Sequence, residues 1–365
     1  MVGPGGARSP IEISSHDGSY AVTFESSSEA LKRLGGAEKA LFFIVDRAVA
    51  EKNTKLIEDI SAFQVLQVDA VSSTKSLEGV ASLASWLIES GADKGALLVG
   101  IGGGAVQDLV SFTAHVYKRG VPWGFLPTTL LSQADSCIGA KSGINLLPYK
   151  NQLGAFHAPT FVNIDSGLLE TLPRQEMVSG LGEILKLSLI SDYSFFDHFE
   201  EASSSGHVKS DALPDLVRRS LVAKKTVIEE DEREEGPRKV LNYGHSFGHA
   251  YEALLGHNVP HGVAVAWGIQ LINFIGVHEG VTDPEISRRV SEVARRLFPG
   301  PPALGEKQGD LISQLKLDKK VSKGLIDFVF MKREGDFLIR PTQLDEKIDR
   351  FVSMFDHELS NPSYA

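Results

Sequence analysis

The chain has 365 residues, of which 42% are hydrophobic and 23% charged, and its formal net charge is -10. This length allows two domains with a substantial core, and the negative charge argues against nucleic acid or an anionic membrane as the main partner. Cys137 is the single cysteine, so no internal disulfide can form and a reducing compartment is expected.

No apolar run approaches the roughly 18 residues that a membrane-spanning helix needs. Residues 1–18 lack the basic and then apolar layout of a secretory signal. The sequence therefore predicts a soluble cytoplasmic protein.

The first half of the chain alternates between two kinds of pattern. Apolar runs at 40–46, 63–69 and 96–101 have the length of buried strands, and apolar residues recur every three or four positions over 76–90. Strands that alternate with helices indicate βαβ units and a parallel sheet.

After about Asp165 helical patterns dominate, at 175–190, 213–230, 240–255 and 263–278. Extended patterns return only at 326–331 and 337–340. We therefore predict a nucleotide-type, Rossmann-like α/β domain over residues 1–168 and a mainly α-helical domain over residues 169–365.

Four histidines lie between residues 245 and 261. His245 and His249 are four residues apart and share one face of a helix, and His257 and His261 follow after a turn. Imidazoles at this spacing are ligands for zinc and similar metals, although an amphipathic helix with a polar face explains one such pair equally well.

Glu183 and Lys186 are three residues apart in an apolar helical pattern, where a surface ion pair is the default interpretation. Beside the histidines, Glu183 would instead complete a three-ligand metal site with an open position for substrate oxygens. The sequence leaves both interpretations open.

Glycines end the predicted strand 96–101 and precede a predicted helix in the stretch VGIGGGAVQD. Such a turn lets a diphosphate approach the backbone and the free N–H groups of the helix start. A tight turn without a ligand is the alternative, because the stretch departs from the G-x-G-x-x-G pattern. Asp46, at the end of an earlier strand, could bind a ribose hydroxyl.

Residues 127–151 are predicted to form a long functional loop, with a solvated surface loop as the alternative. Polar and charged side chains suited to a phosphorylated, hydroxyl-rich substrate lie there and further along the chain. They are Asp135, Lys141, Lys150 and Asn151 in the loop, and Lys224, Arg238, Asn242 and the stretch 318–320 beyond it. Lys224 and Arg238 could also pair with the acidic run 229–235.

Taken together, these motifs resemble the sugar phosphate cyclase superfamily, and within it most closely the 3-dehydroquinate synthases. The resemblance extends from about Phe42 to Phe351 and includes GGGAVQD, YKRGVPWGFLPTTLLSQADS, GAKSGIN, KNQLGAF, GEILK, LNYGHSFGHAYE, PHG and LDKK, in the order and spacing of the family. It implies an NAD-binding α/β domain followed by a metal-binding helical domain.

The resemblance also implies roles for individual residues. Glu183, His245 and His261 match the ligands of a divalent metal, most often zinc, with cobalt as an alternative. Catalytic positions match Asp135, Lys141, Lys186, Asn242 and His249. NAD-binding positions match Asp46, Lys75, Gly103, Gly104, Asp108, Thr128, Thr129 and Leu131. Substrate-binding positions match Arg119, Lys150, Asn151, Lys224, Arg238, Lys319 and Lys320. Arg119 resembles an arginine that reaches the neighbouring subunit's phosphate site, which implies a homodimer.

The implied reaction converts 3-deoxy-D-arabino-heptulosonate 7-phosphate to 3-dehydroquinate and phosphate. It proceeds by transient oxidation with NAD, phosphate elimination, reduction and intramolecular aldol closure, so that NAD is regenerated. Arg238 and Lys224 match the positions that bind the substrate carboxylate, which favours this substrate over sedoheptulose 7-phosphate or glucose 6-phosphate.

Several residues depart from the usual synthase pattern: Ala48, Ser72, Gly182, Leu187 and Val263. A sedoheptulose 7-phosphate cyclase or an amino-dehydroquinate synthase-like enzyme is therefore a second hypothesis. A metal-dependent NAD alcohol dehydrogenase and a non-catalytic metal- or sugar-phosphate-binding protein are hypotheses from other classes. The dehydrogenase would produce or consume NADH in stoichiometric amounts.

Overall fold

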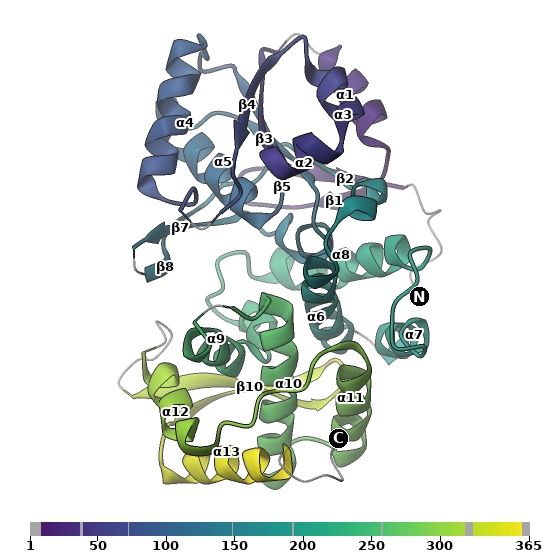
Figure 1. Cartoon of the computed structure of the whole chain (residues 1–365), viewed down its shortest axis with the longest axis vertical. Helices are drawn as coiled ribbons and strands as arrows, with labels where there is room; N and C mark the ends of the chain where they lie inside the picture. The colour runs from purple at the N-terminus through teal and green to yellow at the C-terminus, as the bar shows by residue number, and fades with distance from the viewer. Residues whose placement is uncertain are drawn as a thin grey trace. The chain divides into compact units, whose positions relative to one another are not determined.

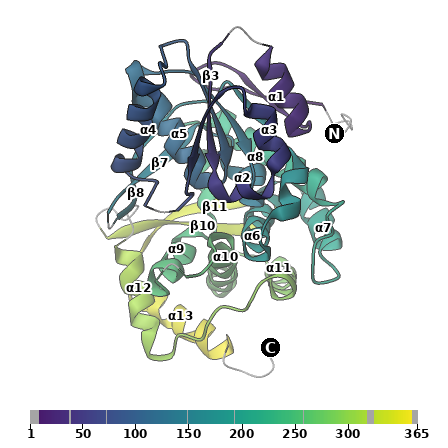
Figure 2. The same ribbon diagram turned by 45° about the horizontal axis from the view of Figure 1, so that its top comes forward.

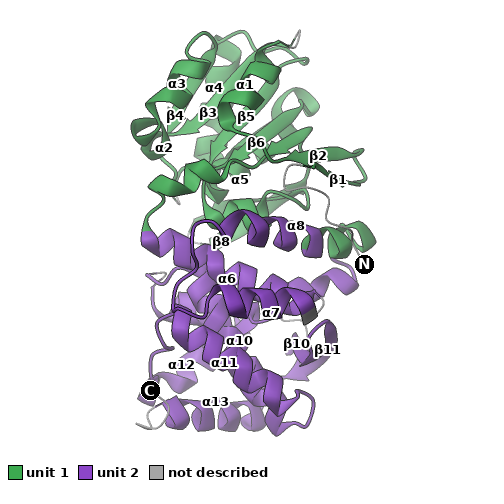
Figure 3. Ribbon diagram, turned by 90° about the vertical axis from the view of Figure 1, so that its right-hand side faces the viewer, with its two compact units in different colours: residues 1–173, 224–233 green, residues 174–223, 234–365 purple. Residues whose placement is uncertain are grey.

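The computed structural model describes residues 9–36, 39–71, 73–147, 149–191, 193–256, 258–317 and 324–359. The chain divides into two compact units, residues 1–173 with 224–233, and residues 174–223 with 234–365 (Figure 3). The sequence placed a single boundary after residue 168, whereas the structure ends the first segment at 173 and adds a second segment from 224 to 233 to unit 1. Within the described ranges, no helix has both the length and the apolar character needed to cross a membrane.

Unit 1 contains a seven-stranded sheet in the order β1-β2-β9-β6-β5-β3-β4. All neighbouring strands are parallel except β1 and β2, which are antiparallel. The strands are β1 (Ile11–Ile13), β2 (Tyr20–Thr23), β3 (Leu41–Asp46), β4 (Gln64–Val68), β5 (Leu97–Gly102), β6 (Trp123–Pro127) and β9 (Phe161–Asn163). The predicted parallel sheet is confirmed, with the three predicted strands observed as β3, β4 and β5.

Helices cover both faces of this sheet, as Figures 1 and 2 show. Phe43 and Val45 of β3 pack in a buried cluster with residues of α1 (Ser27–Gly35), α2 (Arg47–Lys52) and α3 (Thr54–Ile60). The neighbouring Phe42 points to the opposite face and meets Trp86 of α4 (Leu77–Glu89) edge-on, at 5.9 Å between ring centroids. Burial on both faces explains why the strands have continuous apolar runs.

The long loop predicted at 127–151 is wrong, because most of this segment is regular. A π-helical turn (η2, Ser132–Ser136) is followed by an antiparallel hairpin of β7 (Lys141–Leu146) and β8 (Tyr149–Phe156). In β7 Ser142 and Ile144 are buried and separated by the less buried Gly143, as in a strand with one covered face, although Asn145 is buried too.

Unit 2 is mainly helical, as predicted. Its helices are α6 (Arg174–Ile190), α7 (Tyr193–Ala202), α9 (His245–Leu254), α10 (His261–His278), α11 (Pro284–Leu297), α12 (Gln308–Lys316) and α13 (Glu346–Leu359). Helix α8 (Leu213–Glu230) belongs to unit 2 up to residue 223 and to unit 1 from residue 224. The antiparallel hairpin β10 (Leu325–Arg333) and β11 (Asp336–Gln343) completes the unit.

Helix α10 is the central element of unit 2. Most of its residues are buried, whichever face of the helix they lie on. The helix packs against α6, α9, α11, α13 and β10 (Figures 1 and 2). A helix that is apolar all round must be enclosed by its neighbours. The helix predicted at 240–255 is wrong at its start, because a 3-10 turn (η4, Pro237–Asn242) ends there and Gly244 adopts a left-handed conformation before α9 begins.

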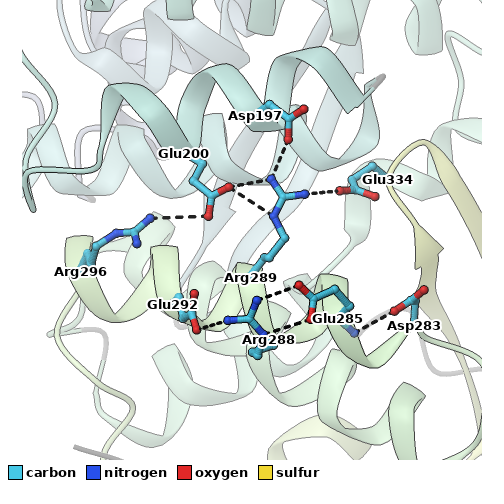
Figure 4. Close-up of polar contacts among 9 residues, drawn as sticks. All are labelled: Asp197, Glu200, Asp283, Glu285, Arg288, Arg289, Glu292, Arg296 and Glu334. Carbon is cyan, nitrogen blue, oxygen red and sulfur yellow. Dashed lines mark hydrogen bonds and ion pairs between the residues drawn. The ribbon is translucent and has the colours of Figure 1, made fainter.

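Arg289 of α11 links two other parts of unit 2 (Figure 4). Its Nη2 atom lies 2.6 Å from Asp197 Oδ1 and 2.6 Å from Glu200 Oε2, both on α7. Its Nη1 atom lies 3.4 Å from Oε1 of the buried Glu334, in the turn between β10 and β11. One guanidinium therefore holds α7, α11 and the hairpin together.

Candidate functional site

Glycines bring the backbones of α6 and α10 into direct contact in unit 2. A Cβ atom added at Gly182 of α6 would lie 2.0 Å from the carbonyl oxygen of Gly262, and one added at Gly262 would lie 1.8 Å from that of Ser179. Gly182 directly precedes Glu183, and Gly262 directly follows His261. The close contact between α6 and α10 therefore brings the side chains of Glu183 and His261 near each other.

A second glycine contact places α9 on α10. Gly244, at φ +76°, directly precedes His245, and a Cβ atom at Gly268 of α10 would lie 1.9 Å from the Gly244 carbonyl oxygen. Only glycine adopts this conformation readily while allowing so close an approach. The start of α9, with His245, is thereby fixed against α10.

These contacts bring two histidine ring nitrogens close to one buried carboxylate. Glu183 is 1% exposed, and its Oε1 atom lies 3.2 Å from His261 Nε2 and 3.6 Å from His245 Nε2. His245, His249 and His261 each offer a ring nitrogen within 4.8 Å of the others. The structure thus brings Glu183 to the histidines, which the sequence left open.

The donor set fits a divalent metal such as zinc or cobalt. One carboxylate and two or three imidazoles are typical ligands of these ions. His245 Nδ1 lies 3.2 Å from the carbonyl oxygen of Tyr243, a contact that leaves Nε2 directed toward Glu183.

Lys186 is the second charged side chain inside α6. Its Nζ atom lies 2.5 Å from Glu183 Oε2, and the two side chains are only 3% and 1% exposed. The default interpretation of a surface ion pair is therefore wrong. The buried ammonium contacts Oε2 of the carboxylate, while Oε1 lies on the side of the histidines.

His261 contacts a second carboxylate through its other ring nitrogen. Its Nδ1 atom lies 3.2 Å from Oε2 of Glu252, on α9. Burial lowers the pKa of His261, but the hydrogen bonds with Glu183 and Glu252 outweigh it and raise the pKa to about 10. The surroundings of His261 therefore favour positive charge. The sequence analysis missed Glu252, although it lies three and seven residues after His249 and His245, on their face of the helix.

Two further predicted residues lie just before α9. Arg238 is buried in η4, and Asn242 at its end donates from Nδ2 to Glu234 Oε1 at 2.5 Å. Glu234 has a left-handed backbone conformation, φ 62°. The contact between Glu234 and Asn242 orients the amide group of Asn242.

The glycine turn of unit 1 begins α5 (Gly104–Val116). Gly103 is its N-terminal capping residue and has no side-chain cap, and a Cβ atom at Gly103 would lie 2.9 Å from Thr129 Cγ2. At Gly104 a Cβ atom would meet nothing within 4 Å. The first backbone N–H groups of α5 therefore have open space beside them, and a phosphate group could occupy it and accept their hydrogen bonds.

Four other predicted cofactor residues lie at the end of β3 and in the turn after β6: Asp46, Thr128, Thr129 and Leu131. The Thr128 backbone donates to the Gly102 carbonyl, and Leu131 precedes the π-helical turn η2. The Asp46 side chain accepts a hydrogen bond from Ala48 N at the start of α2, and burial raises its pKa. Carboxyl ends of parallel strands are where α/β sheets bind ligands.

Lys75 and Asp108 form a partly buried ion pair of 2.5 Å. Asp108 also accepts a hydrogen bond from Gly143 N of β7 at 2.8 Å. Burial raises the pKa of Asp108, and Lys75 opposes that change. The pair thus connects α5 to the hairpin and holds the Lys75 ammonium in place.

Asp135 and Lys224 form a second partly buried charged pair in unit 1. Lys224 Nζ lies 2.6 Å from Asp135 Oδ1 and also donates to the Asp135 carbonyl oxygen at 2.7 Å. Cys137, two residues on, is buried, and burial raises the pKa of its thiol to about 12. Cys137 is therefore a packing residue rather than a nucleophile.

The other predicted substrate residues are exposed. Lys141, Lys150 and Asn151 lie on the β7–β8 hairpin, and Arg119 follows Lys118 in a turn where both have left-handed backbones, φ 64° and 48°. The homodimer that Arg119 implies stays a prediction. Five predicted or noted positions lie outside the described residues: Ser72, His257, Asp318, Lys319 and Lys320.

Solved structures share this fold. A 2-deoxy-scyllo-inosose synthase complexed with carbaglucose-6-phosphate, NAD+ and Co2+ has a TM-score of 0.85 and 21% identity, over 95% of this chain and 99% of its own. A 2-epi-5-epi-valiolone synthase from Streptomyces hygroscopicus subsp. jinggangensis, with NAD+ and Zn2+ bound, has a TM-score of 0.81 and 24% identity, over 93% and 97%. The fold is that of the sugar phosphate cyclases.

Sequence comparisons specify the family. Models of the N-terminal and C-terminal parts of 3-dehydroquinate synthase match residues 65–179 and 180–321. A curated 3-dehydroquinate synthase from Solibacter usitatus is 35% identical over 279 residues, which cover 76% of this chain and 78% of that protein. The chain belongs to the 3-dehydroquinate synthase family, and the resemblance seen in the sequence is confirmed.

Proposed function

We propose that this protein converts 3-deoxy-D-arabino-heptulosonate 7-phosphate to 3-dehydroquinate and phosphate, with NAD and a divalent metal. The observation that carries the proposal is the convergence of His245 and His261 on the buried carboxylate of Glu183, in a chain of this family. Zinc is the metal that this donor set fits first, and cobalt is an alternative.

NAD and the metal, when bound, would supply reversible hydride transfer and polarisation of a substrate oxygen. The start of α5 at Gly103 and Gly104 provides N–H groups for the diphosphate of the dinucleotide. Glu183, His245 and His261 would hold the metal, and Lys186 would neutralise the second oxygen of Glu183.

Charged side chains of this chain would bind the two anionic groups of the substrate. Arg238 offers a planar fork of donors that matches a carboxylate, and Lys224 offers a positive charge already oriented by Asp135. His249, whose ring centroid lies 5.8 Å from that of His261, matches the family position that contacts the substrate phosphate, and we propose the same role for it here.

The substrate assignment is tested by measuring phosphate release from 3-deoxy-D-arabino-heptulosonate 7-phosphate and, in parallel, from sedoheptulose 7-phosphate, which lacks the carboxylate. We expect release from the first substrate, and a loss of at least ~100-fold in kcat/KM for Arg238→Ala because about 3 kcal/mol of charged hydrogen bonding is removed. Arg219→Ala, which removes an arginine of α8 that forms an exposed pair with Asp215, is the control and should retain activity.

A second candidate is a cyclase that forms cyclitols from sedoheptulose 7-phosphate. Gly182 and Leu187, where 3-dehydroquinate synthases usually have alanine and tyrosine, favour it. Release of phosphate only from sedoheptulose 7-phosphate would establish this candidate and contradict the role of Arg238 as a carboxylate-binding residue.

A further inference from the structure

His261 is held between two carboxylates that approach opposite sides of its ring. Glu183 Oε1 lies 3.2 Å from Nε2, and Glu252 Oε2 lies 3.2 Å from Nδ1. A metal bound by Glu183 through its Oε1 atom would share the Nε2 side of the ring. Glu252 is therefore on the wrong side to be a ligand of the same ion.

The position of Glu252 follows from the geometry of α9. His245, His249 and Glu252 are spaced by four and three residues, so the three side chains form one stripe along the helix. This stripe faces His261, the first residue of α10: both other histidine rings lie within 5.8 Å of the His261 ring, centroid to centroid. The Glu252 side chain is only 14% exposed, so solvent screens its contact with His261 weakly.

We propose that Glu252 is a positioning residue for the metal centre. As an acceptor for Nδ1–H, it selects the tautomer of His261 whose Nε2 lone pair points toward Glu183, and it fixes the orientation of the ring. The nearby Val263, two residues after His261, cannot take this role, because its buried apolar side chain has no hydrogen-bond acceptor. This inference rests on the proposed metal dependence.

The test is the metal affinity of the full-length protein, measured for Zn2+ and Co2+ by competition with a chromogenic chelator. Loss of a carboxylate that orients a ligating histidine weakens metal affinity by about 10- to 100-fold. We expect a loss in this range for Glu252→Gln, a larger loss for His261→Ala, and a change in the visible spectrum of bound Co2+ in Glu252→Gln. The unfolding midpoint of the metal-free protein should stay close to that of the wild type.

Glu279→Gln is the matched control, because Glu279 is also a buried carboxylate of unit 2 but contacts Arg340 and Lys347 instead of a histidine. It should bind metal like the wild type. If Glu252→Gln does not fold, Glu252→Asp, which keeps the charge on a shorter side chain, should still show weaker binding and an altered Co2+ spectrum.

Wild-type metal affinity in Glu252→Gln, or an equal loss in Glu279→Gln, would overturn the positioning role and leave the proposed function intact. A wild-type protein that binds neither Zn2+ nor Co2+ would overturn both.

Discussion

At the scale of single residues, glycines account for the geometry of the proposed metal site. Gly182 and Gly262 remove the side chains that would separate α6 from α10, and each adjoins one of the proposed ligands, Glu183 or His261. Gly182 is one of the positions where the chain departs from the usual family residue. The structure shows a packing role for Gly182, because a Cβ atom there would collide with the Gly262 carbonyl oxygen.

Gly182→Ala should therefore destabilise the protein and weaken metal binding. The added methyl group would lie 2.0 Å from the Gly262 carbonyl oxygen, so α6 and α10 must separate, which costs about 1–3 kcal/mol in well-packed cores. Urea unfolding and chelator competition measure the two effects.

Gly309→Ala, in α12 where an added Cβ atom meets nothing within 4 Å, is the control and should be neutral or slightly stabilising. A Gly182→Ala protein with unchanged stability and metal affinity would contradict the role of the close contact.

Residue types and spacing predicted the histidine stripe on α9 but not its partners. The meeting of Glu183 with His245 depends on how α6, α9 and α10 pack, and no local pattern encodes that packing. Glu252 was missed because a carboxylate one turn beyond a histidine pair is ordinary on a helix surface, and only its contact with His261 gives it meaning.

At the scale of elements, Glu279 connects three parts of unit 2. It lies at the C-terminal end of α10 and pairs with Arg340 of β11 and, at 2.6 Å, with Lys347 of α13. Burial alone would raise the pKa of Glu279, but hydrogen bonds from Lys347 and Arg340 outweigh it and lower the pKa below 4.5. These pairs thus stabilise the end of the central helix.

Glu279→Gln should destabilise the protein by about 1–2 kcal/mol at pH 7, as expected for hydrogen bonds to charged groups. Because the folded-state pKa is lowered, this contribution is fully present above the unfolded-state value near 4.5 and is lost as the pH falls through the folded-state pKa. Below the folded-state pKa of Glu279, the free energies of unfolding of the variant and the wild type, measured with urea, should become equal.

Glu285→Gln removes a carboxylate from an exposed pair with Arg288 and serves as the control, with a much smaller effect expected. A difference between Glu279→Gln and wild type that grows toward acid pH would contradict the assignment.

Element types were predictable where the hydrophobic pattern was strong. The buried strands β3, β4 and β5 and the long helices α6 and α10 follow from continuous or helical apolar patterns. The predicted start of α9 was wrong because Gly244, with its left-handed backbone, interrupts the helix before His245. The hairpin at 141–156 was missed because Lys150 and Asn151 on its exposed strand read as loop residues.

At the scale of the whole molecule, the two units carry different parts of the proposed chemistry. Unit 1 carries the glycine turn and the pair of Asp135 and Lys224, whereas unit 2 carries Glu183, the histidines and Arg238. Composition and periodicity predicted an α/β unit and a helical unit, but not a reaction. The family was predictable because many short motifs occur together in family order, and the matches of the family models to residues 65–179 and 180–321 confirm the family.

The proposed function is tested most directly by measuring phosphate and NADH together in one reaction. Purified protein, NAD and zinc or cobalt are mixed with 3-deoxy-D-arabino-heptulosonate 7-phosphate. We expect one phosphate released per substrate consumed and no net NADH, because the hydride returns to the same molecule. We also expect a chelator to abolish activity, because it removes the metal. NADH in stoichiometric amounts would show a dehydrogenase, and no phosphate from this substrate would contradict the proposed function.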